Sequence, residues 1–245
     1  MRPLLPTAIL VLWAAVPLAA QQAGQMQDAR TYLRGYGEVH FQNASGPNTP
    51  GIVSVARFVV FLSHQFNDRI AVRSELEVEN TKVEGGKDGG EVALEQLYLD
   101  YMLSPAFILR AGLVLAPVGI LNETHEPPTF NGVERPAFDH DVIPTTWREI
   151  GVGVVGTIPG KSGFGYRLYL LNGLLASGFS AEEGIRSGRQ EGKEASFANP
   201  SLTGRLEWTR PGLRIGGSFW YGGSANQDPA LGTGPFDNAV SLLYA

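Results

Sequence analysis

The sequence predicts an all-β fold, namely an antiparallel transmembrane β-barrel with about ten strands in its 245 residues. Three observations favour this class. Apolar and polar residues alternate along repeated segments, the connections alternate between long and short, and the chain opens with a segment typical of exported proteins. After Gln21, no apolar run approaches the ~20 residues that a transmembrane helix needs. We therefore expect residues 21–245 to form the barrel.

The first 20 residues are interpreted as a secretory signal peptide. Arg2 supplies a positive start, residues 4–20 are predominantly apolar, and the segment ends on the small residues Ala19 and Ala20. The chain contains 0 cysteines, so disulfides cannot hold the exported fold, which must depend on a large core or a closed ladder of strands. We expect cleavage after Ala20 and a location in the outer membrane of a Gram-negative cell.

Alternation identifies the strands, because successive side chains of a strand point to opposite faces. In segment 69–83, Val72, Leu76 and Val78 share one parity, while Glu75 and Glu77 share the other. Most segments approach the ~9–11 residues of a tilted membrane strand. The predicted strands are 31–42, 52–66, 69–83, 91–103, 106–115, 147–158, 163–174, 200–209, 212–221 and 238–245.

The connections between these strands alternate in length, which is typical of bacterial outer-membrane barrels with short periplasmic turns and long extracellular loops. The short turns centre on Asn67–Asp68, Ser104–Pro105, Pro159–Gly160 and Pro211–Gly212. The long loops cover about 43–51, 84–90, 116–146, 175–199 and 222–237. If Tyr32 starts on the periplasmic side, every short turn falls on that side.

The polar parity carries too many charges for a dry core, so we expect it to face a wet lumen. In lipid every backbone polar group must pair within the protein, and strands can satisfy that condition only as a closed barrel. Glu38, Asp100 and Glu207 lie on the polar parity as well. The pore-lining candidates are Arg34, Arg57, Arg73, Arg110, Arg167, Arg205, Arg214, Glu75, Glu77 and Glu79.

Five segments carry a family resemblance. They are Pro117–Pro128, Val133–Pro136, Ile143–Gly153, Tyr169–Leu174 and Gly184–Arg186. With them the chain resembles a bacterial outer-membrane porin family related to the phosphate-selective porins O and P. The resemblance implies a porin barrel of about 16 strands, a homotrimer when full-length, and passive diffusion of small solutes or ions. Phosphate-selective members line the pore with arginines and lysines, whereas the glutamates here leave an anion preference open.

The resemblance also implies that the third extracellular loop, about residues 116–146, folds into the pore. The constriction-loop candidates are Asn122, Glu123, His125, Glu126, Arg135 and Asp139. Members of this family are longer, and the chain stops at Ser241–Ala245 without the final aromatic residue that such barrels usually carry. We therefore expect an N-terminal fragment whose barrel is incomplete at the C-terminus, although ten strands could also close.

Other functions are less well supported by the residues. Glu123, His125, Glu126, Asp139, His140 and Asp141 share one loop, but without compact ligand spacing, so we expect no metal and no cofactor. Ser63 and His64 are adjacent and would point to opposite faces of a strand, and no nucleophile elbow surrounds Ser218. We do not expect an enzyme. The net charge of −5 argues against nucleic-acid binding.

The main alternative is a secreted or periplasmic β-sandwich that binds carbohydrate or protein. A sandwich would bury the apolar parity between two sheets, whereas a barrel would expose it to outer-membrane lipid. Leu33, Val72, Leu168, Leu206 and Ile215 discriminate between the two, because only the barrel places them on an outward band.

Overall fold

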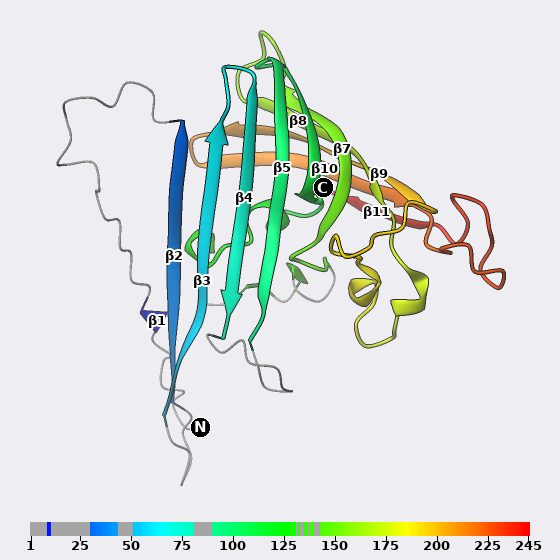
Figure 1. The fold of residues 1–245 in the computed structure, drawn as a ribbon, viewed down its shortest axis with the longest axis horizontal. Helices are drawn as coiled ribbons and strands as arrows, with labels where there is room; N and C mark the ends of the chain where they lie inside the picture. Colours follow the sequence, from blue (N-terminus) through cyan, green and yellow to red (C-terminus); the bar gives the residue numbers. More distant parts are fainter. Residues whose placement is uncertain are drawn as a thin grey trace. The chain divides into compact units, whose positions relative to one another are not determined.

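The computed structural model describes residues 9–10, 30–43, 51–80, 90–130, 132, 135–136, 138–139 and 143–245. The chain is all-β (Figure 1) and divides into two compact units. Unit 1 comprises Met1–Gln65 and Arg73–Leu94, and unit 2 comprises Phe66–Val72 and Glu95–Ala245. No helix in the described part of the chain is long and apolar enough to cross a membrane.

All ten predicted strands are present, and their ends lie within a few residues of the prediction. The end of predicted strand 69–83, from residue 81 onward, lies outside the described residues, as does most of the predicted signal peptide. The strands are β1 (Ile9–Leu10), β2 (Thr31–Gln42), β3 (Ile52–Gln65), β4 (Ile70–Glu79), β5 (Val92–Ser104), β6 (Phe107–Leu115), β7 (Arg148–Thr157), β8 (Phe164–Asn172), β9 (Pro200–Arg210), β10 (Leu213–Gly222) and β11 (Val240–Tyr244).

Unit 1 is built around the antiparallel pair β2 and β3, whose register shifts at a bulge between Glu38 and Val39. The two-residue strand β1, which we did not predict, pairs with β2 at Val39 and His40. Leu33 and Phe58 are exposed, while Val59 and Glu38 are buried. Apolar residues of β3 therefore lie on both of its faces, because Val59 is buried on the face that carries the polar side chains of this strand.

Unit 2 is an antiparallel meander from β5 to β11, in which each strand pairs with the next along the chain. The short predicted turns join these strands as expected. Among the described residues β11 pairs with β10 alone, so the sheet ends there in an edge strand. The all-β class and the antiparallel pairing are confirmed, and closure into a barrel is not among the described pairings.

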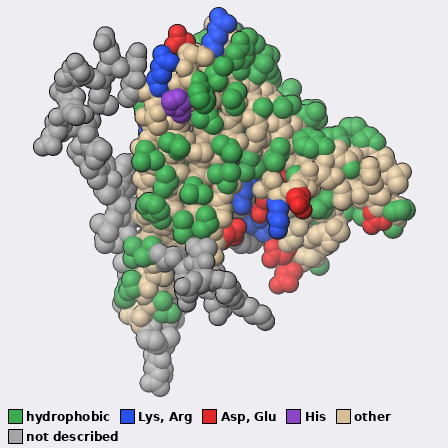
Figure 2. Space-filling view, in the orientation of Figure 1, with side chains coloured by type: hydrophobic (Ala, Val, Ile, Leu, Met, Phe, Trp, Pro, Cys, Tyr) green, Lys and Arg blue, Asp and Glu red, His purple; other side chains and the backbone are tan. Residues whose placement is uncertain are grey.

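One cross-strand row of unit 2 is apolar and exposed on every strand from β5 to β10 except β6, where alanine stands in it. The row follows directly from the register of the pairs. Its large members are exposed by 41–55%, and they are Leu99, Val152, Leu170, Leu202 and Tyr221. Figure 2 shows hydrophobic side chains spread over the visible sheet surface, with charged groups gathered at few places.

The core of unit 2 lies on the other face, between the sheet and the loops that follow β6 and β8. Trp147 and Trp220 are fully buried, and their rings pack at a tilt of 38° with centroids 4.2 Å apart. Val118, Leu171 and Leu174 join the same cluster. The loops contain the short 3-10 helices η1 (Asn122–Thr124), η2 (Pro127–Thr129), η4 (Ala176–Gly178) and η5 (Arg186–Gly188). The described parts of the loops after β6 and β8 therefore pack on the sheet.

Candidate functional site

In the loop between β6 and β7, the side chain of the fully buried Asn122 binds the backbone at both ends of the loop. Its amide Nδ2 donates to the carbonyls of Ala116 at 2.6 Å and Trp147 at 2.8 Å. Its Oδ1 accepts from the Trp147 N–H at 2.7 Å. Asn122 thereby satisfies both backbone groups of Trp147 and holds the two ends of the loop together.

The next residue, Glu123, reaches the charged face of the sheet. Its Oε1 lies 2.6 Å from Arg167 Nε on β8, and its Oε2 lies 4.0 Å from Arg205 Nη1 on β9. Glu207 of β9 contacts the same arginines, at 2.9 Å from Arg167 and 3.0 Å from Arg205. We call Glu123, Arg167, Arg205 and Glu207 the loop–wall cluster.

Strand register explains why this cluster needs two acids. Arg167 and Arg205 are directly opposite in the β8–β9 pair, where like charges repel each other. Glu207 lies two residues after Arg205 and therefore on the same face. Burial raises the pKa of Glu123, and the charges of Arg167 and Arg205 oppose that rise. With two carboxylates and two guanidinium groups, the loop–wall cluster is neutral when all four are ionised.

The backbone of the loop also docks on the sheet. Arg205 Nη1 donates to the Gly119 carbonyl at 2.5 Å, and the Gly119 N–H donates to Ser218 Oγ at 3.3 Å. Arg214 Nη2 donates to the Ile120 carbonyl at 3.2 Å. Side chains of β9 and β10 thus bind the chain ahead of η1 at three points. The loop therefore lies against the polar face of the sheet of unit 2, and its insertion into a pore stays a prediction.

A second charged group on the same unit surrounds Arg110. This guanidinium forms two hydrogen bonds to Asp100, at 2.7 and 3.0 Å. Its carbon lies 3.9 Å from the centroid of the Tyr98 ring, a distance suited to a cation–π contact. Arg110 Nη1 also lies 3.4 Å from the Tyr169 hydroxyl on β8. Asp100 neutralises Arg110, so this group adds little net charge to the face.

Unit 1 carries a separate chain of ion pairs. Arg57 of β3 bridges Glu38 of β2 at 2.7 Å and Glu77 of β4 at 2.8 Å. His40 lies 2.7 Å from Glu38 as well. Among the other candidates in this unit, Glu75 is buried, Glu79 is half-buried, and Arg34 and Arg73 are exposed. The pore-lining candidates of this unit therefore differ in burial. Arg34 and Arg73 are exposed near the starts of their strands, whereas Glu75 is buried.

The remaining candidates of the loop lie further along it. Arg135 Nη1 donates to the Thr145 carbonyl at 2.8 Å. Burial raises the pKa of Glu126 to about 7 and also raises the pKa of the Asp139 carboxyl, while the charge of Arg135 opposes both shifts. His125 is buried. His125 and Glu126 offer donor atoms of the kinds that metal ions bind. The predicted loop residues His140 and Asp141 lie outside the described residues.

Two arginines that the sequence analysis did not select come from the loop after β8. Arg186 Nη2 donates to the Thr145 carbonyl at 2.7 Å. Arg189 Nη1 donates to the carbonyls of Pro144, at 3.1 Å, and Thr146. Burial lowers the pKa of Arg189. These contacts join two loops across more than 40 residues of sequence, and no spacing signal in the sequence indicates them.

The buried polar group at the start of β7 was missed too. Glu149 is fully buried and accepts hydrogen bonds from Asn172 Nδ2 at 2.6 Å and from the Gln190 N–H at 3.2 Å. Asn172 Oδ1 accepts from the Ile150 N–H at 2.7 Å. Glu149 lies on the opposite parity to the apolar run Ile150, Val152 and Val154, so alternation places it on the inner face but does not indicate that it is buried.

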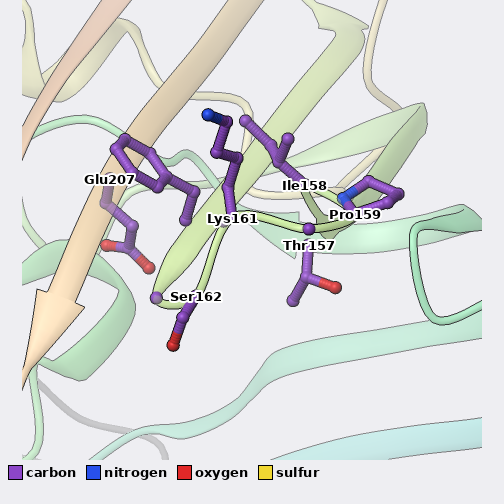
Figure 3. A pocket seen from close by; sticks show the side chains of 10 residues that line it. Thr157, Ile158, Pro159, Lys161, Ser162 and Glu207 are labelled. Carbon is purple, nitrogen blue, oxygen red and sulfur yellow. The ribbon is translucent and has the colours of Figure 1, made fainter.

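A pocket lies at the short turn between β7 and β8, where Pro159–Gly160 forms the bend. Its charged groups are Lys161 on the turn and Glu207 on β9 (Figure 3). In Figure 3 the Lys161 and Ser162 side chains point to opposite sides of the turn. Ligand sites usually gather several convergent polar groups, which this pocket does not offer. We therefore place the candidate site at the charged face and its loop.

No protein-family model matches the chain. A relative in Aquifex aeolicus (strain VF5), an uncharacterized protein, is 41% identical over 199 residues. The match covers 80% of this chain and 45% of the relative, so the chain spans a little under half the length of that curated relative.

Proposed function

We propose that the protein is an outer-membrane porin-like channel for passive diffusion of small solutes. The observation that carries this proposal is that the two faces of unit 2 differ in polarity. One face presents the exposed apolar row that includes Val152, Leu170 and Leu202. The other face holds the charged groups and the loop between β6 and β7. A sheet with apolar groups on its outer face and charges on its inner face is suited to a barrel that is surrounded by lipid and encloses a water-filled lumen.

The apolar row argues for lipid as the environment of the outer face. Monomeric soluble proteins rarely expose contiguous apolar patches of more than a few hundred Å². In lipid, unpaired backbone groups at an open edge such as that of β11 cost several kcal/mol each. We therefore propose that further strands complete a closed barrel, with the complete protein assembling as a homotrimer.

The position of the loop between β6 and β7 supports a channel with a narrow point. Glu123 is bound to the wall through Arg167 and Arg205, so in the proposed barrel the loop would narrow the lumen. A ring of charges at a narrow point sets ion preference through its electric field. Because the loop–wall cluster contains equal numbers of acids and arginines, we propose a weakly selective channel for small solutes, without a dedicated phosphate site.

Channel recording on the complete gene product, purified in detergent and inserted into planar bilayers, tests the proposal. We expect stepwise conductance, and we expect Arg205→Glu to shift the reversal potential in a KCl gradient toward cation preference. Arg210→Glu, at the exposed end of the same strand, is the matched control and should leave the reversal potential unchanged.

Two results would count against the channel. A protein that stays monodisperse in water without detergent would favour a secreted or periplasmic β-sandwich that binds a ligand. If the protein inserts into membranes but shows no conductance, the proposed barrel stands and the proposed transport function is wrong. Fractionation of Gram-negative cells, with the protein expected in the outer membrane, separates these two outcomes.

A further inference from the structure

The loop between β6 and β7 returns to the sheet through residues 143–147, which we call the return arm. This segment comes before the first residue of β7 and is mostly buried, so its backbone carbonyls need hydrogen-bond donors. The carbonyls of four successive residues, 144 to 147, accept from side chains. Asn122 of the same loop binds the last of them, whereas Arg186 and Arg189 of the loop after β8 bind the first three. The return arm is therefore bound by side chains that lie 41 to 45 residues further along the chain.

Arg189 uses every nitrogen of its guanidinium group at this place. Its Nη1 donates to the Pro144 carbonyl at 3.1 Å and also to the Thr146 carbonyl. Its Nε donates to the Arg186 carbonyl at 2.9 Å, and its Nη2 lies 3.0 Å from Glu191 Oε1. The guanidinium is thus oriented by its own loop and binds two carbonyls of the return arm. A lysine ammonium would not reproduce this contact, because it is a point charge on a flexible stem, whereas the planar guanidinium presents its donors in fixed directions.

Gln190, the next residue, attaches the same segment to the sheet. Its backbone N–H donates to Glu149 Oε1 at the start of β7, at 3.2 Å. Its Nε2 donates to the Gly173 carbonyl just after β8 at 2.8 Å, and its Oε1 accepts from the Ser196 N–H at 2.7 Å. Arg189 therefore binds the return arm from a segment that is itself fixed to two strands.

Arg186 makes a second contact with the return arm. Its Nη2 donates to the Thr145 carbonyl at 2.7 Å. The same carbonyl also accepts from Arg135 Nη1 at 2.8 Å. Loss of Arg186 therefore leaves a charged donor on this carbonyl, and the two arginines of the loop after β8 differ in how far the return arm depends on them.

We infer that Arg189, supported by Arg186, is a positioning residue for the proposed pore, because it fixes the return arm of the loop that would narrow the lumen. The start of that loop is bound separately, by Arg205 to the Gly119 carbonyl and by Arg214 to the Ile120 carbonyl. Release of the return arm would therefore free one end of the loop while the other end stays on the wall. The contact between the two loops does not depend on the channel, whereas its effect on ion flow rests on the proposed function.

Hydrogen exchange of the complete protein in detergent, followed by mass spectrometry of peptides that span residues 143–149, tests the contact. The Thr145 N–H donates to the Ile143 carbonyl and the Trp147 N–H donates to Asn122 Oδ1, both at 2.7 Å, so both amides should exchange slowly while the return arm is in place. We expect Arg189→Met to speed exchange of these amides by at least about tenfold.

Three further variants sharpen the result. Arg189→Lys should also exchange faster than wild type, because it keeps the charge but not the planar set of donors. Arg186→Met should have a smaller effect, because Arg135 still binds the Thr145 carbonyl. Lys193→Met removes a positive charge from an exposed position of the same loop and is the matched control, with exchange expected to equal that of wild type.

Exchange of amides in β9 and β10 reports whether each variant keeps its fold. If folded Arg189→Met exchanges as slowly as wild type in the return arm, the positioning role is wrong. If protection is lost equally in β9 and β10, Arg189 supports the whole fold and the positioning role is again wrong.

Single-channel recording of Arg189→Lys tests the consequence for the pore. We expect more open-channel current noise with an unchanged reversal potential, because the return arm is released while the charge is kept. Faster exchange without added noise would overturn the role in the pore. If the wild-type protein shows no conductance, only the channel is wrong, and hydrogen exchange still decides whether Arg189 holds the return arm.

Discussion

The side chain of Asn122 hydrogen bonds to both backbone groups of Trp147, at 2.8 Å to the carbonyl and 2.7 Å from the N–H. The Trp147 carbonyl also accepts from the Ala116 N–H at 2.9 Å, so the amide side chain adds to the backbone pairing just before β7 begins. Trp147 in turn packs against the tilted ring of Trp220 on β10. The start of the loop, the start of β7 and the buried tryptophan pair are therefore joined through one residue.

We expect Asn122→Ala to destabilise the protein by about 2–4 kcal/mol, because three hydrogen bonds are lost and the N–H of the buried Trp147 loses its acceptor. Asn122→Asp should be at least as harmful, since an oxygen would replace the amide nitrogen that donates to two carbonyls. Urea unfolding followed by tryptophan fluorescence measures the change. Thr124→Ala, in the same short helix, is the control, and equal losses in both variants would contradict the anchoring role.

If the protein is the proposed channel, Glu123→Gln should make it more anion-selective. The substitution changes the net charge of the loop–wall cluster from zero to +1, while the amide can still accept a hydrogen bond from Arg167. The reversal potential of single channels in a KCl gradient reports the change. Glu182→Gln removes an exposed acid from the loop after β8 and should have little effect. An equal shift in both variants would mean that overall charge, and not this cluster, sets selectivity.

An arginine introduced on the outer face should show whether that face lies in lipid or in water. Val152 lies in the middle of β7 and is 55% exposed. If it faces acyl chains, Val152→Arg should reduce the stability of the liposome-inserted protein by up to about 2–4 kcal/mol. Leu231→Arg, on an exposed loop position, should be nearly neutral. A neutral Val152→Arg in urea titrations of the liposome-inserted protein would place this face in water.

Asp139→Asn should stabilise the loop near neutral pH. Burial raises the pKa of Asp139 above its usual value, so the folded protein favours the protonated acid. Stability from this group is complete below the pKa of the unfolded chain, and it is lost as pH rises through the raised pKa. Thermal midpoints at acidic and mildly alkaline pH should therefore differ less in Asp139→Asn than in wild type. Asp68→Asn, at an exposed turn, should leave the difference unchanged.

The strands could be predicted closely because their signal is local. Alternation of Val72, Leu76 and Val78 with Glu75 and Glu77 reports the period of an extended backbone, whatever the rest of the chain does. Turn residues such as Pro159–Gly160 and Pro211–Gly212 act locally as well. Short connections also favour antiparallel pairing of the strands that they join, since antiparallel neighbours can be connected by a few residues.

The candidate site could be predicted only in part. Arg167, Arg205 and Glu207 were assigned to one face from parity alone, and Glu123 was assigned to the loop. Their meeting was not predictable, and neither was the approach of Glu95 to His125 or of Arg189 to the backbone of residues 144–146.

The sequence by itself determined which segments are strands and which of their faces is polar, because both depend on residues one or two positions apart. The tertiary structure decided which loop residues lie against which strand side chains. The path of a loop is set by contacts such as Gly119 with Arg205, and Arg186 with Thr145, whose partners are 86 and 41 residues apart. Such contacts form only when the sheet has already brought distant segments together.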